Sequence, residues 1–163
     1  MLVLAGCIML LAAGTGAGFY KADKLKAQAD YLRDILNMAE KIKIYVASDY
    51  MTSEEIFQRL ADDESLCGLE FLRCGFSRDI TDDLRKSVGS DECEYLLCIK
   101  NKLMEYFGSF GKTDMQGQLA RTETLRRDAE ELWKFHQDRY NKYARLYRVI
   151  GFLGGLLAAV VLI

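Results

Sequence analysis

Hydrophobic and polar positions divide the chain into three zones. Residues 1–20 and 149–163 carry no charge, and all 22 basic and 24 acidic side chains lie in residues 21–148. Within that middle segment, apolar residues recur every three or four positions, which is the period of an amphipathic helix. Proline is absent from the whole chain. We therefore expect an all-α protein whose charged middle segment is flanked by two apolar helices.

The last third of the chain, residues 114–163, predicts one long helix. From Leu125 to Tyr147 the apolar positions are three or four apart, so they share one face. After Arg148 every side of the helix is apolar, which indicates either deep burial or lipid. Because no later segment is present to bury it, we expect 149–163 to be a C-terminal transmembrane helix.

Residues 1–20 predict an N-terminal transmembrane helix, because a span needs ~20 apolar residues. A cleaved secretory signal would begin with a basic segment, which is absent here. A lipoprotein box ending at Cys7 is disfavoured, since the apolar stretch follows this cysteine instead of preceding it. Lysines and arginines border both spans on the side of residues 21–148. This distribution predicts that 21–148 is a cytoplasmic helical domain.

Small residues stand four positions apart in both apolar segments, a spacing that allows two helices to approach closely in lipid. Small residues are also common in membrane helices in general, so specific packing and simple composition both remain open. If packing is specific, the two spans form a hairpin or pack against a partner subunit through these residues. The pairs are Gly14–Gly18, Gly151–Gly155, Gly154–Ala158 and Gly155–Ala159.

The middle segment predicts a bundle of about six helices, counting the long terminal one once. The first span continues as an amphipathic helix to about Ala47, and Thr52 with Glu55 forms a capping box for the second helix. In the turn before the long helix, Gly108 is expected to stop the preceding helix and Gly111 to adopt positive φ. The remaining predicted helices are 66–75, 81–89 and 90–107.

No combination of residues indicates a catalytic, cofactor or metal site, so we expect a protein that is not an enzyme. The five cysteines lack the spacing of a zinc knuckle, and we expect them to act as small apolar residues beside helix cores. Their odd number suits a reducing compartment. His136 lies on an apolar stripe and is expected to be buried there. A net charge of −2 gives no support for nucleic-acid binding.

Two segments resemble those of a known family. These are the turn FGSFGKTDMQGQ at 107–118, which includes Asp114 and Gln118, and the apolar tail IGFLGGLLAAVVLI at 150–163. Both are similar to the stage III sporulation protein AB family, and the similarity runs along the whole chain. Residues 41–60 are also similar, except at 46–53, where the family usually has Gly and then Thr-Pro-Leu.

The resemblance implies a non-enzymatic membrane subunit of the secretion-like channel between mother cell and forespore. It implies a place in the outer forespore membrane, a soluble domain similar to the type II secretion platform protein, and binding to other channel subunits and a cytoplasmic ATPase. The residue pattern alone indicates only a membrane-anchored helical scaffold. A small metal or redox module and a holin-like pore-former are the alternatives, and self-association is left open.

Overall fold

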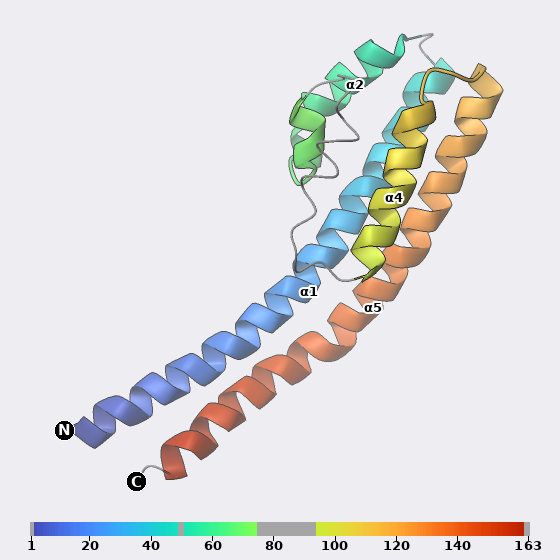
Figure 1. The fold of residues 1–163 in the computed structure, drawn as a ribbon. Helices are drawn as coiled ribbons and strands as arrows, with labels where there is room; N and C mark the ends of the chain where they lie inside the picture. Colours follow the sequence, from blue (N-terminus) through green and yellow to red (C-terminus); the bar gives the residue numbers. More distant parts are fainter. Residues whose placement is uncertain (1, 49–50, 75–93, 162–163) are drawn as a thin grey trace. The chain divides into compact units, whose positions relative to one another are not determined.

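The computed structural model describes residues 2–48, 51–74 and 94–161, and every regular element in these ranges is helical (Figure 1). The all-α prediction is therefore confirmed. The described elements are α1 (Leu2–Ser48), α2 (Ser53–Ala61), the 3₁₀ helices η1 (Glu64–Leu66) and η2 (Glu70–Cys74), α4 (Glu94–Ser109) and α5 (Met115–Val161).

The chain forms two compact units. The hairpin unit combines residues 1–30 with 133–163, and the bundle unit comprises residues 31–132. Helices α1 and α5 are each 47 residues long and contribute to both units. The prediction that the first apolar segment continues without a break into an amphipathic helix is confirmed, since α1 runs from Leu2 to Ser48.

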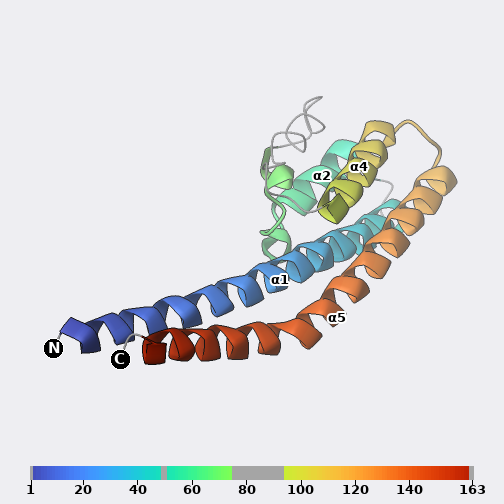
Figure 2. The same cartoon turned by 60° about the horizontal axis from the view of Figure 1, so that its bottom comes forward.

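The bundle unit has a core built from α1, α2, α4 and α5, together with the two 3₁₀ helices. Its centre is aromatic: the ring centroid of Phe107 lies 5.0 Å from that of Phe57 and 5.8 Å from that of Phe71. Such edge-to-face and tilted pairs add ~0.5–1.5 kcal/mol each beyond the burial of their area. The helix α4 lies beside α2 (Figure 2). It contacts α2 through the rings of Phe107 and Phe57 and α5 through Tyr106. The largest fully buried side chains of this core are Leu32, Ile35, Met38, Ile42, Ile56, Phe57, Leu60, Leu69, Leu72, Ile99 and Leu103.

The predicted capping box at the start of α2 is present. The Thr52 hydroxyl accepts a hydrogen bond from the backbone N–H of Glu55 at 3.4 Å, and the Glu55 carboxylate accepts from the backbone N–H of Thr52 at 2.9 Å. The carboxylate also accepts a hydrogen bond from the Thr52 hydroxyl at 3.0 Å, and the two bonds that it accepts from Thr52 favour its charged form and lower the pKa of Glu55.

The predicted α-helix 66–75 is wrong: this stretch holds the two short 3₁₀ helices. Asp63 caps η1 by accepting a hydrogen bond from the backbone N–H of Ser65 at 2.9 Å. At Gly68 the backbone lies so close to α1 that a Cβ atom would overlap a carboxylate oxygen of Asp34. The chain is therefore held against α1 in tight turns. The predicted helix 81–89 and the start of the predicted helix 90–107 lie outside the described residues.

Candidate helix-packing site

The hairpin unit is an antiparallel pair made of the first part of α1 and the last part of α5 (Figure 1). The backbone of Gly18 lies beside Tyr147, that of Gly14 lies beside Gly151, and that of Gly155 lies beside Leu11. Residue numbers thus rise along one helix as they fall along the other.

Four of the glycines singled out from the sequence meet at this helix contact, which we call the glycine seam (Gly14, Gly18, Gly151 and Gly155). A Cβ atom added to Gly14 would lie 2.8 Å from the carbonyl oxygen of Gly151, and one added to Gly18 would lie 2.6 Å from that of Tyr147. A Cβ on Gly151 would lie 2.6 Å from the Gly14 carbonyl oxygen. These neighbours are backbone atoms, which cannot rotate away, so a side chain here requires the helices to separate.

Other glycines in the same helices face away from the seam. A Cβ on Gly16 or Gly154 would meet nothing within 4 Å. Of the two overlapping small-residue pairs in α5, Gly155–Ala159 faces α1, because both residues are buried. The Cys7 thiol donates a long hydrogen bond, 3.7 Å, to the Ala159 carbonyl oxygen. The neighbouring residues Gly154 and Ala158 are exposed.

The outer surface of the hairpin unit is covered by large apolar side chains. Met9 is 78% exposed, Leu157 is 65% exposed and Val161 is 85% exposed. Small residues inside and large apolar residues outside are the reverse of a water-soluble helix pair, and they match helices that pack in lipid. The exposed apolar residues in the uncharged segments are Ile8, Met9, Phe19, Tyr20, Val149, Ile150, Phe152, Leu153, Leu156, Leu157, Val160 and Val161.

The first charged residues on the two helices stand at the same level. Lys21 Nζ lies 5.6 Å from the ring centroid of Tyr147, and the guanidinium of Arg148 lies 5.4 Å from that of Phe19. An amphipathic tyrosine ring such as that of Tyr147, together with basic side chains at the end of an apolar segment, is typical of a membrane–water interface.

Among the described residues, α5 is the one helix that is long and apolar enough to cross a membrane, and most of its apolar part is not buried. This supports the predicted C-terminal span by length and composition. A second span at residues 1–20 stays a prediction, as do the domain boundaries at residues 20 and 148.

The remaining glycine and polar candidates lie at the turn between α4 and α5. Gly111 has φ of +76°, as predicted, and a Cβ there would also lie 2.6 Å from Ser53 Oγ at the start of α2. Gly108 is not the helix stop, because α4 continues through it to Ser109, and a Cβ on it would meet open space. Helix α4 ends at Ser109, and Gly111, two residues later, takes the left-handed conformation that L side chains resist.

Asp114 caps the long helix. Its carboxylate accepts a hydrogen bond from the backbone N–H of Gly117 at 3.1 Å, and its carbonyl accepts from that of Gln118 at 2.9 Å. The Gln118 carbonyl accepts in turn from the Thr122 hydroxyl at 2.8 Å. These bonds cap the start of α5, and the turn motif belongs to the bundle unit, whereas the glycine seam belongs to the hairpin unit.

A buried hydrogen bond next to this turn was not found from the sequence. The hydroxyls of Tyr106 on α4 and Thr122 on α5 lie 2.7 Å apart, and both side chains are buried. Burial disfavours the phenolate and raises the pKa of Tyr106 to about 12, although the bond to Thr122 opposes this shift. Sixteen residues separate the pair, so no local pattern identifies it.

The cysteines and the histidine differ in whether the structure buries them as expected. Cys67 and Cys98 are exposed, so the expectation that they act as core residues is wrong for these two. Cys93 lies outside the described residues, and so does the side chain of Cys74. His136 is 1% exposed, as expected, and burial together with nearby Arg139 lowers the pKa of its imidazole. Within the ranges described, no three His, Cys, Asp or Glu side chains cluster as a metal site.

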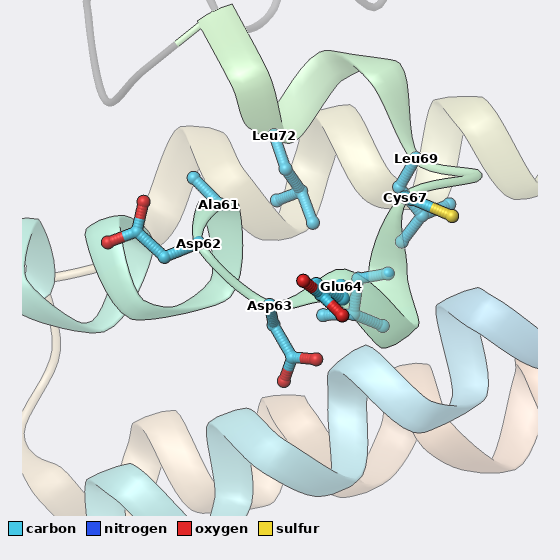
Figure 3. A pocket seen from close by; sticks show the side chains of 8 residues that line it. Ala61, Asp62, Asp63, Glu64, Cys67, Leu69 and Leu72 are labelled. Atoms are coloured by element: carbon cyan, nitrogen blue, oxygen red, sulfur yellow. The ribbon is translucent and has the colours of Figure 1, made fainter.

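A cavity of about 300 Å³ in the bundle unit is lined by acidic residues and leucines (Figure 3). Asp62, Asp63 and Glu64 come from the end of α2 and η1, and Leu69 and Leu72 lie further along the chain. Asp63 forms an ion pair with Lys41 of α1, and the hydrogen bond from that ammonium is the largest cause that lowers its pKa to about 2. Asp63 therefore ties the wall of the cavity to α1.

The model of the family described as stage III sporulation protein AB matches residues 3–163. No curated protein and no solved structure is significantly similar to the chain.

Proposed function

The chain belongs to the stage III sporulation protein AB family, and from this membership we propose that it is a non-enzymatic membrane subunit of the channel between mother cell and forespore. In this proposal the hairpin unit anchors the protein in the outer forespore membrane. The bundle unit is a platform for the cytoplasmic ATPase that drives the channel, as in secretion machines.

The inverted packing of the hairpin unit is the observation that carries the membrane part of this proposal. Glycines line the contact between the helices, while Met9, Leu157 and Val161 are largely exposed. In water, this surface would favour aggregation, whereas in lipid it costs nothing to expose. Lys21 lies beside Tyr147, so both helices leave their apolar segments at the same level. This supports one membrane–water interface for the two helices.

The orientation rests on charge. Basic side chains follow the first uncharged segment and precede the second, so both clusters lie on the side of the bundle unit along the chain. Positive charge collects on the cytoplasmic side of membranes. The bundle unit would then lie in the mother-cell cytoplasm, where it could meet an ATPase.

A co-purification experiment tests the proposal. A tagged full-length protein is extracted with mild detergent from sporulating cells, and the bound proteins are identified by mass spectrometry, with an untagged strain as the control. We expect the tagged protein only in the membrane fraction, together with other channel subunits and the ATPase. Extraction without detergent, or recovery of no channel subunit, would contradict the proposal.

A further inference from the structure

We propose that the hairpin unit carries a binding surface for anionic lipid headgroups, formed by residues 21–26 and 139–148 and called the basic band below. This inference rests on the membrane insertion proposed above, and it adds a lipid class that the protein recognises. The two segments lie alongside each other in the antiparallel pair, since Lys21 stands beside Tyr147 and residue numbers run in opposite directions from there.

The charge of the basic band is almost entirely of one sign. It holds seven lysines and arginines and a single carboxylate, Asp23, although the whole chain has a net charge of −2. Clusters of four to eight basic residues next to a membrane span attract anionic lipid through the surface potential of the leaflet. The bundle unit, by contrast, has more acidic than basic residues.

The cations of the basic band are available to a ligand. Lys24, Lys26 and Arg145 are exposed, and no carboxylate among the described residues pairs with them. Lys21 and Arg148 lie over aromatic rings, and no carboxylate among the described residues pairs with either of them. Ion pairs such as Lys43–Glu123 and Lys102–Asp128, by contrast, join residues of the bundle unit.

The position of the basic band fits phosphate headgroups. The band begins at the residue that follows the uncharged segment on α1 and ends at the residue that precedes it on α5. At a rise of 1.5 Å per residue, Lys24 and Arg145 stand about 6 Å beyond the apolar segments, within the ~10 Å over which a charge is felt at 0.1 M salt. Anionic phosphates are the charges that an inserted hairpin places at this level.

The test measures lipid selectivity of the full-length protein in vesicles of phosphatidylcholine with 20% phosphatidylglycerol. Spin-labelled forms of the two lipids report, by electron paramagnetic resonance, how much of each is motionally restricted by the protein. The variant replaces Lys24, Lys26 and Arg145 with glutamine. Its matched control replaces Arg33, Arg121 and Arg127, which are exposed cations of the bundle unit, with glutamine as well.

We expect the wild type and the control to prefer phosphatidylglycerol by roughly threefold or more at low salt, and the preference to fall towards unity at 0.5 M salt and in the band variant. Equal restriction of both lipids by the wild type would overturn the basic band as a lipid site while leaving membrane insertion intact. Loss of selectivity in the control variant but not in the band variant would overturn it too. Restriction of neither lipid would contradict membrane insertion itself.

Discussion

Replacing Gly151 and Gly155 with leucine tests whether the glycine seam holds the hairpin unit together. At Gly151 a Cβ atom alone would lie 2.6 Å from the Gly14 carbonyl oxygen, and ordinary contact begins near 3.4 Å. At Gly155 the corresponding atom is the Leu10 carbonyl oxygen, 3.2 Å away. Leucine adds three more carbons to each Cβ, so α5 must move away from α1.

The loss follows from the contacts along the seam. A gap of 0.5–1 Å forfeits a quarter to a half of the attraction of each heavy-atom pair across the seam, and overpacking a close contact typically costs ~1–3 kcal/mol. The side chains of leucine require a wider gap. We therefore expect the double variant to lose about 1–3 kcal/mol of hairpin stability, which lowers the unfolding midpoint by roughly 5 °C.

Trp133 is the only tryptophan and lies in the hairpin unit, so its fluorescence follows thermal unfolding of this unit in the detergent-solubilised full-length protein. The matched control is Gly154→Leu with Ala158→Leu, which adds almost the same apolar volume, one methyl group less, to the exposed face of α5. The control should keep the wild-type midpoint and support sporulation, whereas the seam variant should stay in the membrane and sporulate poorly. Equal midpoints for the two double variants would refute the reasoning.

Three further predictions concern the bundle unit. Gly111→Val should destabilise the protein by about 1–2 kcal/mol in chemical denaturation, because φ of +76° disfavours L side chains. The control Gly108→Ala should be neutral or stabilising. Equal losses of stability in the two variants would contradict the claim that positive φ at Gly111 requires glycine. Tyr106→Phe should cost about 1 kcal/mol for its buried hydrogen bond. Since the pKa of Tyr106 is raised to about 12 in the folded state, the wild type should also lose stability as pH rises from about 10 through 12, a loss that this variant lacks; identical alkaline profiles would contradict this. A reporter fused after residue 100 should be active only in the cytoplasm, and activity across the membrane would reverse the proposed topology.

Signals that act within one turn of helix were sufficient to predict much of the fold. The capping box of Thr52 and Glu55, the unbroken α1 and the positive φ of Gly111 all follow from residues that are neighbours in sequence. The third helix was mispredicted because its shape depends on the approach of Gly68 to Asp34, which are far apart in the chain.

The glycine seam could be predicted only in part. Spacing identified every small-residue pair, but it could not decide between Gly154–Ala158 and Gly155–Ala159, which differ by one position and so by about 100° around the helix. The choice depends on where α1 lies. The exposure of Cys67 and the bond between Tyr106 and Thr122 depend on tertiary contacts in the same way.

Disulfide cross-linking in native membranes tests the central claim, that the two uncharged segments pair through the glycine seam, most directly. The native Cys7 Sγ lies 3.7 Å from the carbonyl oxygen of Ala159, whereas Ala158 is exposed on the other face of α5. In a full-length chain that keeps Cys7 and has the other four cysteines replaced with serine, Ala159→Cys should give a rapid intramolecular disulfide upon mild oxidation, and Ala158→Cys should not. Equal cross-linking of both variants, or disulfides formed only between chains, would contradict the account.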